Sequence, residues 1–89
     1  MSYWIEWPTL EEFIKDDIGI KIRADCDDHY LVFITETKDE NGNDAYALIV
    51  SRNFNDETIG IVHTTEELHK ELNKYFYFSG VRIHDYEFV

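Results

Sequence analysis

The sequence has little cysteine, proline or glycine: one Cys, one Pro and four Gly among 89 residues. Cys26 alone cannot form an internal disulfide, so the fold needs no oxidising compartment. So few Pro and Gly exclude a collagen-like or low-complexity chain. No apolar run approaches the roughly 18 residues of a membrane span, and no basic-then-apolar leader opens the chain. We therefore expect a soluble, cytoplasmic protein.

Basic residues are also scarce, since eight Lys and Arg stand against nineteen Asp and Glu, giving a net charge of −11. Such a charge repels phosphate backbones and anionic lipid, so we expect no direct binding to nucleic acid or membrane. It attracts cationic surfaces and speeds association with them. Acids on a small domain also repel one another, which favours a function for the charge, although solubility alone is the simpler explanation.

What the chain does have is apolar and aromatic side chains. Apolar residues make up 44% of it, and they include six Phe, six Tyr and two Trp. That supply is enough to build one core, because each aromatic side chain can bury roughly 150–250 Å². No repeat or linker divides the sequence. We therefore expect residues 1–89 to form a single domain.

The residue pattern predicts the element order β-α-β-β-β-β-α-β. Two capping boxes, Thr9 to Glu12 and Thr64 to Glu67, mark the starts of two helices with apolar stripes. Alternating apolar residues predict strands over 3–7, 18–24, 29–37, 45–51, 57–63 and 81–88. Asn41-Gly42 predicts a hairpin between two of them. The expected fold class is α+β, with an antiparallel sheet of five or six strands and two helices on one face.

The acidic residues concentrate in the predicted connections. An up-and-down meander alternates its connections between the two ends of the sheet, so each acidic loop can be assigned to an end. One end is expected to gather Asp16, Asp17, Asp39, Glu40, Asp44, Glu66 and Glu67. The opposite end is expected to gather Asp25, Asp27, Asp28, Asp56 and Glu57. These acids are the candidate partner-binding residues, although polar turns that favour Asp and Asn are the ordinary explanation for them.

The histidines and acidic turns do not form a recognisable metal site. His63, Glu66 and His69 are spaced by three, but His63 is expected before the helix, so the three do not share a helix face. The segment from Asp39 has its Gly at the fourth position of a calcium loop, not the sixth, and Val50 at the twelfth. We therefore expect no metal and no cofactor.

No arrangement of residues predicts catalysis. Carboxylates stand on both sides of Cys26, and a thiol among carboxylates is expected to be a poor nucleophile. The sequence contains no Gly-rich phosphate loop and no nucleophile elbow. Paired carboxylates can hydrolyse glycosides, but a chain this short leaves little room for a substrate cleft. We therefore expect a protein that is not an enzyme.

The aromatic run Tyr75-Phe76-Tyr77-Phe78 lies in the second predicted helix, where four consecutive side chains cannot all face one core. Tyr77 in particular is expected to be exposed, or covered by the last strand or by a partner. Exposed aromatic residues beside acids are a composition typical of protein interfaces.

Capped helices, a hairpin-rich sheet and acidic loops at Asp16-Asp17, Asp39-Glu40 and Asp25/Asp27/Asp28 together resemble the small acidic inhibitor proteins of phages. These include DNA mimics that block restriction and repair enzymes, and anti-CRISPR proteins. The resemblance covers the whole chain in size, charge and layout, with no family-specific motif, so no residue roles carry over.

The resemblance implies a monomeric or homodimeric binding protein that acts in the host cytoplasm if it is phage-encoded. It would inhibit a basic nuclease, repair or defence enzyme by occupying that enzyme's phosphate-binding surface. Two alternatives stay open. One is an immunity protein or antitoxin against a basic nuclease toxin. The other is a small structural or regulatory domain whose charge serves solubility.

Overall fold

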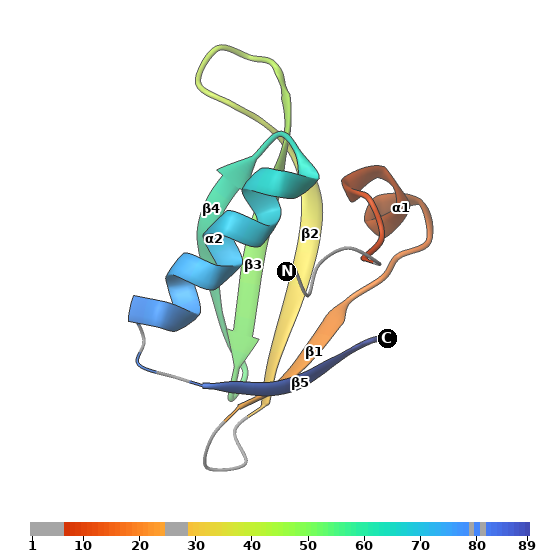
Figure 1. The fold of residues 1–89 in the computed structure, drawn as a ribbon. Coiled ribbons are helices and arrows are strands. Elements are labelled where there is room, and N and C mark those ends of the chain that lie inside the picture. The colour runs from red at the N-terminus through yellow and green to blue at the C-terminus, as the bar shows by residue number, and fades with distance from the viewer. Residues whose placement is uncertain (1–6, 25–28, 79, 81) are drawn as a thin grey trace.

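The chain folds into a five-stranded antiparallel sheet with two helices (Figure 1). The computed structural model describes residues 7–24, 29–78, 80 and 82–89. The elements are α1 (Leu10–Lys15), β1 (Ile20–Ala24), β2 (His29–Lys38), β3 (Asp44–Arg52), β4 (Asn55–Val62), α2 (Thr65–Phe78) and β5 (Ile83–Phe88). The predicted α+β fold class is confirmed. The first predicted strand, 3–7, lies outside the described residues except for Trp7. Neither of the described helices is long and apolar enough to cross a membrane.

The strands lie in the order β4-β3-β2-β1-β5. β1 to β4 form the predicted meander, and β5 returns after α2 to pair antiparallel with β1. β4 and β5 are therefore the two edges of the sheet. β2 is twice as long as β1, and Ile20 at the start of β1 pairs with Val32 near the middle of β2. Beyond that point α1 lies beside β2 in place of a strand (Figure 1).

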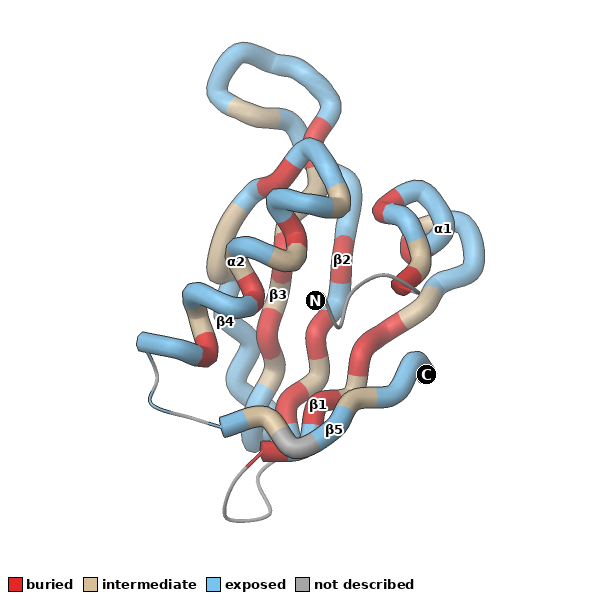
Figure 2. Tube along the Cα trace, in the orientation of Figure 1, coloured by how far each residue is buried: buried red, intermediate tan, exposed pale blue. Residues whose placement is uncertain are grey.

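Both helices pack on the same face of the sheet, as the sequence predicts. Figure 2 shows the buried positions alternating along the strands beneath α1 and α2. The core joins these two helices to β1, β2, β3 and β4 through Leu10, Phe13, Ile20, Ile22, Ala24, Tyr30, Val32, Ile34, Leu48, Val50, Val62, Leu68, Leu72 and Phe76. The apolar stripes predicted from helical spacing therefore face the sheet.

The two predicted capping boxes differ in how completely they form. At α1, the Glu12 N–H donates to Thr9 Oγ1 (3.2 Å), and the Thr9 N–H donates to Glu12 Oε1 (3.0 Å). At α2, the Glu67 N–H donates to Thr64 Oγ1 (3.1 Å), which is one of the two hydrogen bonds of a capping box. The Glu67 carboxylate instead accepts from the His63 N–H (2.8 Å), one residue before the cap. Glu67 thus ties the end of β4 to the first turn of α2.

No described element covers the other face of the sheet, which we call the open face. Its centre is apolar, with Phe33 and Ile61 exposed by 40% and 47%, and with Leu31, Ala47 and Ile49 half-buried around them. At the β1–β5 side of this face, Lys21 pairs with Glu87 (3.9 Å) and Arg23 with Asp85 (2.8 Å). The prediction of β2 as a central strand is confirmed, but its second apolar face lies open.

Replacing the buried Leu72 by Ala removes a core contact between α2 and the sheet. Because Leu72 is only 1% exposed, we expect Leu72→Ala to lower the free energy of unfolding by about 2–5 kcal/mol. The exposed neighbour Asn73 is the control, and Asn73→Ala should change it by no more than about 0.5 kcal/mol. Urea unfolding followed by circular dichroism measures both. Equal effects would contradict the packing of α2 described above.

Candidate functional site

The β2–β3 hairpin and the start of α2 lie together at one end of the sheet (Figure 1). A contact across them sets this arrangement: His63 Nε2 lies 2.9 Å from Asp39 Oδ2. On its other side, His63 Nδ1 lies 3.4 Å from Glu67 Oε1. His63 therefore stands between a hairpin carboxylate and a helix carboxylate. The prediction that Asp39, Glu40, Asp44, Glu66 and Glu67 share one end is consistent with this geometry.

Asp39 serves the fold of the hairpin. Its Oδ1 accepts from the N–H groups of Asn41 and Asn43, each at 2.9 Å, and its side chain is only 17% exposed. Gly42 completes the turn at φ 79°, a conformation that favours glycine. The hydrogen bond with His63, followed by the backbone bonds, lowers the pKa of Asp39. This carboxylate is therefore held inside the hairpin and presents little surface to a partner.

Asp44 and Glu67 also have partners within the protein. Asp44 forms an ion pair with Lys38, which raises the pKa of Lys38, and the nearby Asp39 and Glu36 raise it further. Glu67 is held by His63. In the described part of the chain, no hydrogen bond or ion pair engages the carboxylates of Glu40 and Glu66. Both side chains are exposed, so they are available to a cationic partner.

Two acids that the sequence prediction missed belong to the same end. Glu36 is opposite Tyr46 in the β2–β3 register, close enough to Lys38 to influence its pKa. Glu11 lines a shallow pocket with residues of the β4–α2 junction, among them His63 and Thr64. The signal for Glu36 was its place at the polar end of β2, just before the hairpin. We call the group Glu11, Glu36, Asp39, Glu40, Asp44, Glu66 and Glu67 the acidic end.

Asp16 and Asp17 do not join the acidic end, which corrects the predicted grouping. They lie in the turn between α1 and β1, which leads to Gly19. A Cβ at Gly19 would lie 3.3 Å from the Phe33 ring, so this turn ends level with Phe33. Phe33 precedes Lys38 by five residues, roughly 17 Å along β2. The prediction assumed that β1 runs the full length of β2, but β1 is half as long. The two acids therefore lie beside the sheet.

The opposite end of the sheet is only partly described. Asp25, Asp27 and Asp28 lie outside the described residues, so their grouping stays a prediction. Asp56 and Glu57 are exposed at the start of β4, where they pair with Ser51 and Val50 of β3. The sequence predicted a loop up to Asp56, but β4 already begins at Asn55 because residues 53 and 54 turn at positive φ. Both acids therefore belong to an edge strand.

Many of the described basic residues are neutralised away from the acidic end. The ion pairs join Lys21 to Glu87, Arg23 to Asp85 and Lys74 to Glu71. Within the acidic end the described bases are Lys38, which is paired with Asp44, and His63. The acidic end therefore keeps an excess of negative charge. Among the described residues, no group of three His, Cys, Asp or Glu is arranged to hold a metal ion.

The pKa values of the two described histidines around α2 are shifted in opposite directions. The hydrogen bond with Asp39 raises the pKa of His63 above its ordinary 6.5, whereas burial lowers the pKa of His69 below it. The His63 contribution to stability is present below pH 6.5 and is lost as the pH rises through its folded pKa. The Asp39 contribution is present above its ordinary pKa of 3.8 and is lost as the pH falls through its lowered folded pKa. The contact is therefore strongest between about pH 3.8 and pH 6.5.

NMR titration of the imidazole protons tests this assignment. Asp39→Asn keeps an oxygen that can accept the two backbone bonds but removes the charge beside His63. We expect this variant to bring the His63 pKa back toward 6.5 and to leave His69 unchanged. A His63 pKa at or below 6.5 in the unmodified protein would contradict the contact.

Similarity to known proteins adds nothing to this description of the site. The chain matches no protein-family model, no curated protein and no solved structure. A function must therefore be inferred from the fold and from the charges at the acidic end.

Proposed function

We propose that the protein binds and inhibits a basic, nucleic-acid-binding protein by placing its acidic end in that protein's phosphate-binding surface. The observation that carries the proposal is a pair of exposed carboxylates, Glu40 and Glu66, on two elements that His63 and Asp39 hold together. Neither carboxylate forms a hydrogen bond or ion pair within the described residues. Carboxylates fixed on a compact scaffold can imitate phosphates, which recur about every 3.4 Å along one DNA strand.

The acidic residues with partners inside the protein also support this proposal, because they hold their neighbours in place. Asp39 and Glu67 use their carboxylates to fix the hairpin and the start of α2. This internal anchoring keeps neighbouring acids in place before a partner arrives, so less conformational entropy is lost on binding. The negative charge around them steers a cationic partner toward this end. The proposed role is one of binding, with no chemical step.

Salt and competing DNA provide the test. Immobilised protein is incubated with a bacterial lysate at about 0.05 M and about 0.2 M salt, and bound proteins are eluted with duplex DNA. We expect basic nucleic-acid-binding proteins to be retained at the lower salt, to be released by DNA, and to bind far less at the higher salt. The identity of the retained protein separates an inhibitor of a defence or repair enzyme from an antitoxin.

Two matched double variants separate the effect of the acidic end on binding from the effect of net charge. Glu40→Gln/Glu66→Gln and Asp16→Asn/Asp17→Asn each remove two negative charges, but only the first pair lies in the acidic end. We expect the first double variant to weaken the purified partner's affinity by roughly tenfold and the second by less than about threefold. Equal losses would mean that charge acts only in bulk, and no loss from either would reject the proposal.

A further inference from the structure

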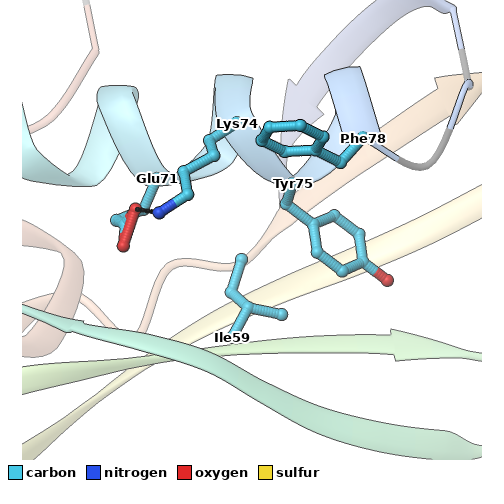
Figure 3. A pocket seen from close by; sticks show the side chains of 5 residues that line it. All are labelled: Ile59, Glu71, Lys74, Tyr75 and Phe78. Atoms are coloured by element: carbon cyan, nitrogen blue, oxygen red, sulfur yellow. Dashed lines mark ion pairs between the residues drawn. The ribbon is translucent and has the colours of Figure 1, made fainter.

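A groove runs between the second half of α2 and the edge strand β4, well away from the hairpin. Ile59 forms its floor on β4, and Glu71, Lys74, Tyr75 and Phe78 line it from α2 (Figure 3). Its volume is about 290 Å³. Glu71 and Lys74 pair with each other at 3.9 Å on one side, so the remaining lining is apolar and aromatic.

A β-bulge in β4 shapes this groove. Leu48 pairs with Gly60 and Ile49 pairs with Thr58, so Ile59 is an extra residue with no partner on β3. Such bulges re-aim a side chain, and here Ile59 points toward α2 (Figure 3). Gly60 leaves room for Glu71, because a Cβ at Gly60 would lie 3.3 Å from Glu71 Oε1. A glycine within a predicted strand was the sequence signal for this irregularity.

The backbone of β4 offers hydrogen bonds along the same groove. β4 is an edge strand, so no described strand meets the N–H and C=O groups on its outer side. Natural edge strands are commonly protected by lysine, by proline or by a bulge. β4 contains neither lysine nor proline, and its bulge at Ile59 leaves residues 55–58 in regular register with β3. An extended segment can therefore add beside it, with main-chain bonds to β4 and alternate side chains directed toward the groove.

The charges around β4 indicate which kind of extended segment can bind beside it. Asp56 and Glu57 lie in β4, which contains no basic residue, and they outnumber Arg52 of β3, which is opposite Asn55. Lys74 in the groove lining is paired with Glu71. Glu57 also lies beside Tyr75, whose pKa is raised first by burial and then by this carboxylate. A second copy of the chain would bring the same acidic strand and be repelled, whereas a strand with Lys or Arg would be attracted.

Two exposed aromatic residues end α2 beside the groove. Tyr77 and Phe78 are 77% and 75% exposed, which agrees with the expectation for Tyr77. Only Phe78 lines the groove. Aromatic residues carry a large share of binding energy at protein interfaces, so Phe78 is the natural anchor and Tyr77 is its matched control.

We propose that β4 and this groove dock an extended basic segment of a partner protein, which adds as a further strand and places an apolar side chain against Ile59, Tyr75 and Phe78. This surface is separate from the acidic end, and the proposal does not depend on the function assigned to that end.

Peptide selection on the intact protein tests the proposal. A random twelve-residue peptide library displayed on phage is selected on the unmodified protein, with counter-selection on the Phe78→Ala variant. We expect enriched peptides to alternate Lys or Arg with aliphatic or aromatic residues. Phe78→Ala should weaken binding of the synthetic peptides by about tenfold or more, and Tyr77→Ala by less than about twofold. NMR spectra should place the largest shift changes in β4 and the second half of α2.

N-methylation tests the strand pairing itself. Methylating the alternate peptide amides that face β4 should abolish binding, whereas methylating the intervening amides should leave it nearly unchanged. The proposal is overturned if no peptide is enriched, if enriched peptides lack basic residues, or if Phe78→Ala and Tyr77→Ala behave alike. It is also overturned if neither set of methyl groups matters, or if sedimentation shows a second copy of the chain pairing on β4.

Discussion

A single apolar layer between one face of the sheet and two helices holds this protein together. Leu68, Leu72 and Phe76 of α2 press against β-strand residues, and α1 continues the layer where β1 stops. The two described helices cover one face of the five-stranded sheet, and no described element covers the other. The open face and the two edge strands lie outside this layer. Every surface considered for binding lies where that layer ends.

The carboxylates of this protein differ in the contacts that they make within the fold. Asp39 and Glu67 bind backbone N–H groups and His63, so their negative charge organises the hairpin and the start of α2. Asp85, Glu87 and Glu71 neutralise nearby bases. Glu40 and Glu66 do neither in the described part of the chain. Acidic composition alone therefore says little about binding, because only the acids that the fold does not use are available to a partner.

Local patterns predicted the elements well because each depends on neighbouring residues. Thr9 and Glu12 are close in sequence, and Asn41-Gly42 makes its own turn, so both predictions are confirmed. Long-range features were harder. The contact between His63 and Asp39 joins residues that are 24 positions apart, and the place of Asp16 depends on how far β1 extends along β2. The groove on β4 depends on a one-residue register shift that no periodicity reveals.

The contrast between the open face and the acidic end means that dissolved ions act on them in opposite senses. Added electrolyte shortens the reach of the carboxylate field, which weakens attraction for a cationic surface and equally weakens the repulsion between copies. Strongly hydrated anions such as sulfate also favour the removal of exposed apolar area from water, and Phe33 and Ile61 provide such area. In concentrated sulfate, molecules of this protein should thus meet through the sheet, whereas in dilute buffer their mutual repulsion keeps them apart.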